Sequence, residues 1–150
     1  MKNWKKVAIA IAVTSIIFTG CGDSIDKQKL ADLTAQKSFK QIEEAYTMSV
    51  YNDNPNAKIY AYWLKENGKK EQPSFDFDLL EMKVQKGKKD IEKGVEKMIA
   101  KLPHMSYNSL KMLKTQTAFM GLSFKIYKEK LFPAISAEMH KRLHPKKAKK

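Results

Sequence analysis

DFDLLEMKVQKGKKDIEKGVEKMIAKL, residues 76–102, is the stretch of sequence that decides the fold. Apolar side chains and one glycine recur every three or four residues through a lysine-rich background, at Phe77, Leu80, Val84, Gly87, Ile91, Val95, Met98 and Leu102. An α-helix turns once in about 3.6 residues, so this spacing places them along one side of a single long helix. Pro103 ends the pattern.

Two alternatives to one continuous helix arise within this stretch. Gly87 and Gly94 each weaken a helix by about 1 kcal/mol, so the helix can break near Gly87 and restart with Asp90 as its cap. The alternation of apolar and acidic residues over 75–78 is typical of a strand. It covers too few residues to outweigh the helical spacing around it.

Two further stretches show the same helical spacing on either side of this one. Residues 26–51 have apolar positions from Leu30 to Val50, with Asp26 placed to cap the start, and residues 107–131 have a wide apolar face. Pro133 kinks or restarts the chain, and a short amphipathic helix follows as far as Leu143.

Residues 57–66, AKIYAYWLKE, fit two structures. Pro55, with Asn54 as a cap and Gly68 beyond the end, favours a short helix. The aromatic and β-branched residues and the Asn67-Gly68 pair are typical of a β-hairpin. We favour the helix. The predicted fold is therefore mainly α, a small antiparallel bundle of three long helices plus short helices around one core. The alternative is an α+β fold with a hairpin in residues 57–84.

The first 21 residues, MKNWKKVAIAIAVTSIIFTGC, differ in character from the rest. Three lysines precede the apolar run at 7–18, and small residues follow it, which is the layout of a bacterial export signal. The run is shorter than the roughly 20 apolar residues that cross a bilayer. Cys21, the only cysteine in the chain, follows Gly20 directly.

This segment resembles the signal peptide of a bacterial lipoprotein, with its lipobox ending at Gly20 and Cys21. The resemblance covers residues 1–23 only. It implies that the chain is cleaved between Gly20 and Cys21 and that Cys21 carries diacylglycerol, often with a further acyl chain on the new N-terminus. The alternative is an ordinary secretory signal with an unrelated cysteine.

The resemblance implies an exported protein held on the cell membrane by its lipid. In a host with two membranes, Gly22 in place of an aspartate favours the outer membrane. The predicted organisation is a signal peptide at 1–20, a lipidated tether at 21–25, a helical domain at 26–143 and a basic tail at 144–150.

Charge is distributed unevenly along the chain, whose net charge is +13. Residues 21–100 hold 14 lysines and 14 acidic residues, whereas residues 101–150 hold 12 basic residues and only Glu129 and Glu138 as acids. Arg142 is the one arginine among 29 basic residues. Since arginine is the usual choice for reading bases and phosphates in a fixed geometry, this composition argues against specific nucleic-acid recognition.

The basic end is the candidate binding surface of the domain. Its cationic residues are Lys141, Arg142, Lys146, Lys147, Lys149 and Lys150. They could contact anionic lipid headgroups, an acidic envelope polymer or an acidic envelope protein. The alternative is a tail that only confers solubility. We therefore expect a membrane-anchored envelope lipoprotein that acts as a binding or structural module.

A second hypothesis is a small envelope enzyme or metal carrier. His140 and His144 lie four residues apart and would share one face of a helix, with Glu138 as a third ligand. Neighbouring cations oppose this site. The acidic pairs at 43–44 and 76–78 do not face each other on a helix, and no nucleophile or acid–base set stands out. The sequence therefore predicts no catalytic residue, metal or cofactor.

Overall fold

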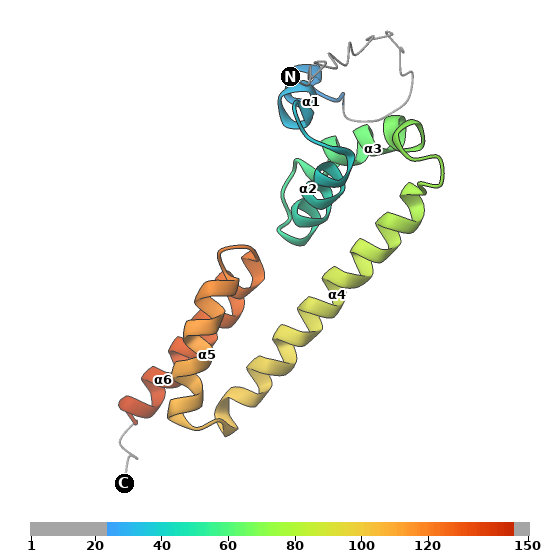
Figure 1. Ribbon diagram of the computed structural model, residues 1–150. Helices are drawn as coiled ribbons and strands as arrows, with labels where there is room; N and C mark the ends of the chain where they lie inside the picture. The colour runs from blue at the N-terminus through green and yellow to red at the C-terminus, as the bar shows by residue number, and fades with distance from the viewer. Residues whose placement is uncertain (1–23, 146–150) are drawn as a thin grey trace, which may run out of the picture.

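A computed structural model describes residues 24–145, and every regular element in this range is helical (Figure 1). The elements are α1 (Lys27–Thr34), α2 (Phe39–Tyr51), α3 (Ala57–Glu71), α4 (Phe77–Lys101), the 3-10 turn η1 (Leu102–His104), α5 (Tyr107–Met120), the π-helical turn η2 (Tyr127–Leu131) and α6 (Phe132–Leu143). The described residues form no strand, so the mainly α prediction is confirmed and the hairpin alternative for residues 57–84 is wrong.

Helix α4 is the longest element and runs unbroken for 25 residues. Its N-terminus is capped by Asp76, whose Oδ1 accepts a hydrogen bond from the backbone N–H of Leu79 at 3.2 Å. The helix has no break near Gly87, so the alternative of two helices in this stretch is wrong. A Cβ at Gly87 would lie 2.3 Å from the Tyr51 hydroxyl oxygen, so this glycine makes room for Tyr51 against the helix.

The buried residues form two clusters along α4, where the sequence predicted one core. The first cluster comprises Ile42, Tyr46, Tyr60, Leu64, Phe75, Phe77 and Val84. The second comprises Val95, Leu102, Leu110, Leu131 and Ile135. A 25-residue helix is about 37 Å long, whereas α2 and α5 have 13 and 14 residues. Two sets of shorter helices therefore pack against successive parts of α4, as Figure 1 shows.

The predicted helix over residues 26–51 is divided between α1 and α2. Asp26 caps α1, as expected, by accepting from the N–H of Lys29 at 3.1 Å. A second start follows at Ser38, whose hydroxyl oxygen accepts from the N–H of Gln41 while the Gln41 side chain accepts from the N–H of Ser38. This reciprocal capping box, at a spacing readable in the sequence, begins a new helix inside the apolar pattern.

Helix α3 includes the favoured helix at residues 57–66 and continues five residues beyond it. Gly68, expected from the sequence to lie just past the end of this helix, is a buried residue inside α3. The ring of Phe75 lies against this glycine, with Cδ1 at 2.2 Å from where a Cβ would stand. Gly68 therefore allows close packing and does not end the helix.

The predicted helix over residues 107–131 is also divided. Helix α5 ends at Met120, and a turn leads to η2 and α6, with Pro133 in the first turn of α6, where its missing N–H costs nothing. The side chain of Asn52 holds the turn: its amide donates to the Ser123 carbonyl at 2.9 Å and its Oδ1 accepts from the Lys125 N–H at 2.7 Å. These bonds join residues more than 70 positions apart, so local sequence gives no signal for them.

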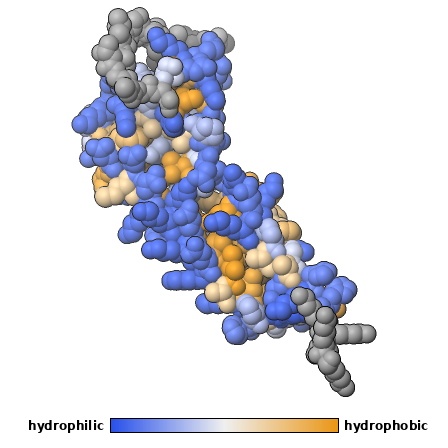
Figure 2. Space-filling view, turned by 180° about the vertical axis from the view of Figure 1, so that it is seen from behind, coloured by the Kyte–Doolittle hydropathy of each residue, from blue (hydrophilic) through white to orange (hydrophobic). Residues whose placement is uncertain are grey.

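The second cluster is surrounded by hydrophobic residues that remain partly exposed to solvent. Its neighbours Met98, Ile99, Leu113 and Ile126 are only partly buried. Seen from behind, a strip of hydrophobic residues runs along this half of the molecule between hydrophilic margins (Figure 2).

Candidate functional site

The predicted lipid-attachment site lies outside the described residues. Gly20 and Cys21 precede residue 24, and Lys146, Lys147, Lys149 and Lys150 follow residue 145. Cleavage and acylation at Cys21 and contact of these lysines with an anionic surface therefore stay predictions. Within residues 24–145, no helix is both long and apolar enough to cross a membrane.

The two predicted basic-surface residues on α6 have different environments. Lys141 is exposed. Arg142 instead turns inward: its Nε donates to Glu138 Oε1 at 2.9 Å, and its terminal nitrogens donate to the backbone carbonyls of Leu102, Pro103 and Met105. The guanidinium group thus binds the backbone of η1 and Met105, just past the C-terminus of α4. Its part in an anionic surface is correspondingly smaller than the sequence suggested.

A signal for this role was present in the sequence. Arg142 is the single arginine in a chain that otherwise uses lysine. A guanidinium group carries five donors in a rigid plane and can serve several acceptors at once, which an ammonium group on a flexible chain does less well. A lone arginine on a lysine-rich helix is therefore a candidate for a multiply bonded position.

The candidate metal ligands are brought only partly together. The rings of His140 and His144 lie 4.6 Å apart between centroids. Glu138, the expected third ligand, is bound by Arg142. Across residues 24–145, no group of three or more His, Cys, Asp or Glu side chains is arranged to hold a metal ion.

The acidic pairs considered for catalysis have structural roles or face solvent. Asp76 caps α4. Burial raises the pKa of Glu43, and the neighbouring Glu44 raises it further, against a lowering by Lys40. Burial, with a smaller contribution from Glu81, also raises the pKa of Tyr46, so this phenol stays protonated at neutral pH.

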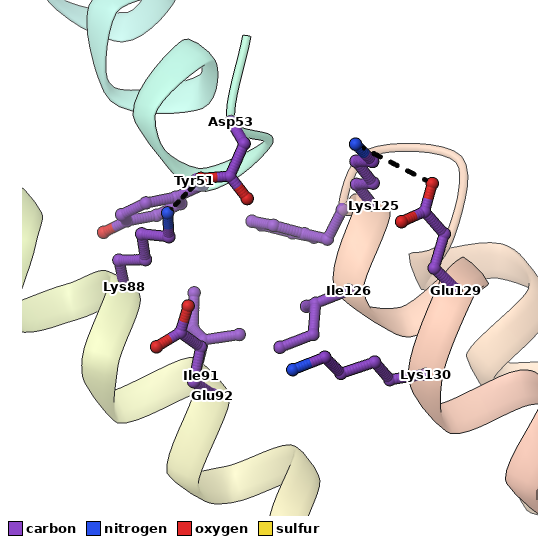
Figure 3. Close-up of a pocket in the computed structure, with 10 residues that line it drawn as sticks. Tyr51, Asp53, Lys88, Ile91, Glu92, Lys125, Ile126, Glu129 and Lys130 are labelled. Atoms are coloured by element: carbon purple, nitrogen blue, oxygen red, sulfur yellow. Dashed lines mark hydrogen bonds and ion pairs between the residues drawn. The ribbon is translucent and has the colours of Figure 1, made fainter.

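A small pocket lies where the two halves of the molecule meet, and no pattern in the sequence predicted it. It has a volume of about 100 Å3 and lies between the end of α2, the middle of α4 and the turn before η2 (Figure 3). Asp53 pairs with Lys88 of α4, and Lys125 lies 3.9 Å from Glu129. The rings of Tyr51 and Phe124 stand 6.2 Å apart.

The side chains that line this pocket connect neighbouring helices and form no recognisable catalytic or ligand-binding set. Acidic and basic side chains alternate around it, and Lys130 extends from η2 toward α4 (Figure 3). Tyr51 and Asn52 contact the turn before η2 through a ring and two hydrogen bonds, and Asp53 forms an ion pair with α4. Three consecutive residues therefore join the end of α2 to both α4 and the second half.

The outward side of α5 carries two large exposed apolar side chains among uncharged residues. Asn108, Met112, Thr115, Gln116 and Phe119 are exposed and fall at helical spacing on one side, which we call the α5 face. Met112 is 67% exposed, Phe119 78%, and Leu122 in the following turn 82%. No member of this face is charged, although charged residues make up 30% of the chain.

No protein-family model, no curated protein and no solved structure matches this chain.

Proposed function

We infer that this chain is an exported cell-envelope lipoprotein that acts as a binding or structural module, with Cys21 as its lipid-bearing residue. One observation carries the proposal: the sole cysteine directly follows a charged segment, a twelve-residue apolar run and a small residue. A lone cysteine cannot form an intramolecular disulfide in an oxidising compartment, and acylation gives it a role. Two or three acyl chains would suffice to hold the helical body on a membrane.

The partner in this proposal is an anionic surface or an acidic envelope protein. The support is the uneven distribution of charge along the chain. Residues 21–100 have no net charge, and residues 101–150 carry all of the excess positive charge that follows residue 20. Because Arg142 is bonded inward, the proposal assigns contact with this partner to Lys141 and the last four lysines of the sequence. In a host with two membranes, Gly22 favours the outer membrane as the site.

The anchor is tested by Cys21→Ser. Cells grown with a labelled fatty acid should incorporate label into the natural chain, and the variant should lose essentially all of it, because serine offers no thiol for the thioether link. Gel fluorography of the immunoprecipitated protein measures this. Equal labelling of the two chains would contradict lipidation at Cys21.

The tail is tested by deleting residues 146–150, which retains Arg142 and its bonds to the carbonyls of Leu102, Pro103 and Met105. The comparison uses residues 24–150, because every residue of both clusters lies within them. At about 1 kcal/mol per lysine near an anionic surface, loss of four lysines should weaken binding to phosphatidylglycerol vesicles by at least about tenfold at low salt. Near 1 M salt, where the Debye length is about 3 Å, the difference should largely vanish.

Vesicle co-sedimentation across a salt series measures this effect. A chain from which Ala148 alone is deleted is the matched control, since it shortens the tail without removing charge. Equal affinity of the full and truncated chains at low salt would reject a role for the tail.

A further inference from the structure

The exposed side of α5 differs from the exposed side of α4 in its chemistry. Exposed positions of α4 include the apolar residues Leu79 and Met82 but are mostly charged, at Asp78, Lys83, Lys86, Lys89, Asp90, Lys93, Glu96, Lys97 and Lys101. The α5 face has no charged member, and its aromatic residue Phe119 is 78% exposed. A helix with apolar residues on both its inner and its outer side is expected to be covered on both.

The α5 face is also long enough to form a contact surface. Met112 and Phe119 are seven residues apart, which places them about 10 Å apart along the helix. Leu122 follows in the next turn, where its N–H donates to the Phe119 carbonyl and its side chain is 82% exposed. Large apolar side chains gathered in this way mark an interaction site more often than single exposed ones do.

The charged residues around the α5 face favour one kind of binding partner over another. Between Glu96 and Glu129 the chain holds six lysines and no acidic residue. Lys111 flanks the face on α5, and Lys128 lies against the turn at Gly121. A second copy of this chain would bring the same lysines into contact with these, so like charges oppose self-association here. An apolar centre with a cationic rim instead complements an anionic lipid bilayer, where apolar residues enter the interface and lysines meet the headgroups.

We propose that the α5 face binds an anionic lipid bilayer, with Phe119 and Leu122 inserted below the headgroups and the surrounding lysines at their level. The proposal rests on the proposed function in one respect, namely that the lipid on Cys21 brings the molecule to the bilayer. Cys21 comes six residues before α1, which lies toward the N-terminal end of α4 (Figure 1), whereas Phe119 and Leu122 lie near the middle of the molecule, beside the turn that Asn52 bonds. Contact at these two places lays the long axis of the molecule along the membrane surface.

The test places an indole on this face in the full chain. Phe119→Trp is compared with Met82→Trp, since Met82 is also apolar and 63% exposed but lies on α4 among charged residues. Each chain is reconstituted into phosphatidylcholine vesicles with and without phosphatidylglycerol, with acyl chains brominated to quench fluorescence. The unsubstituted chain supplies the background signal, from Trp63 in the cleaved chain and also from Trp4 if residues 1–20 are retained, and this signal is subtracted.

With phosphatidylglycerol present, the indole from Phe119→Trp should lose roughly half of its emission, as expected for a group about 5–10 Å deep in the interface. The indole from Met82→Trp should lose little. Equal quenching at the two positions, or none at Phe119→Trp, would overturn the proposal. Quenching that is unchanged in pure phosphatidylcholine would overturn its commitment to an anionic surface.

Two further readouts keep the result interpretable. Circular dichroism should show the same helix content and melting for both variants, because each replaces a mostly exposed side chain. The fatty-acid labelling described above reports the anchor independently. A labelled chain whose Phe119→Trp indole stays unquenched therefore refutes the α5 face alone, whereas an unlabelled chain whose indole is quenched refutes the anchor alone.

Discussion

Gly68→Ala should destabilise the protein by about 2 kcal/mol, although alanine is the better helix former by about 1 kcal/mol. The added methyl would stand 2.2 Å from Cδ1 of Phe75, closer than the atoms can approach. Phe75 is only 8% exposed and packs edge-on against Phe39 with ring centroids 5.0 Å apart. Moving that ring disturbs the first cluster, and overpacking of this kind costs about 1–3 kcal/mol.

Gly94→Ala is the matched control for this prediction. Gly94 is also inside a helix, but a Cβ there would meet no atom within 4 Å. The substitution should therefore stabilise the protein by roughly 0.5–1 kcal/mol through helix propensity alone. Urea unfolding followed by circular dichroism measures both. Stabilisation of similar size by both substitutions would show that the contact between Gly68 and Phe75 does not exist in solution.

Arg142→Ala should destabilise the second half by about 2–4 kcal/mol. The change removes the donors that serve the carbonyls of Leu102, Pro103 and Met105, and it leaves the carboxylate of Glu138 without its partner. The Glu138 side chain is only 14% exposed. A poorly solvated charge or acceptor that loses its partner costs more than the bond itself contributed. Lys141→Ala, one residue earlier and exposed, should change stability by less than about 0.5 kcal/mol.

Two companion variants separate charge from geometry at this site. Arg142→Lys keeps the positive charge but cannot place donors on several carbonyls at once, so it should recover only part of the loss. Glu138→Ala in the Arg142→Ala background removes the unpaired carboxylate and should also recover part of it. Circular dichroism is the suitable measurement here, because it reports the helices of both halves. Trp63 packs against the first cluster, so its fluorescence would report mainly on the half that these substitutions do not touch. If Arg142→Ala and Lys141→Ala were equally mild, the guanidinium contacts would carry no weight in stability.

The helical class and the run of α4 could be predicted from sequence because they depend on local spacing. Phe77, Val84, Val95 and Leu102 form one helical stripe whatever packs against it. The start of α2 was also readable in principle, since Ser38 and Gln41 form a capping box by local bonds. It was missed because the apolar pattern continued across it.

Other features depend on residues far apart in the chain and had no local signal. Gly68 and Gly87 resembled helix breaks, and only the positions of Phe75 and Tyr51 show that they make room for rings. The end of α5 depends on Asn52, which bonds the turn from the other half. The inward position of Arg142 likewise follows from the fold of α6 against η1, so its charge alone suggested a surface role.

The division of the interior into two clusters bears on how this sequence can diverge. A change of volume at Leu64 can be compensated only by its neighbours in the first cluster, and one at Leu110 only by those in the second. Compensating substitutions among descendants of this chain should therefore fall into two separate blocks. Tyr51 and Asn52, which contact the turn before η2, are the place where the two blocks would have to change together.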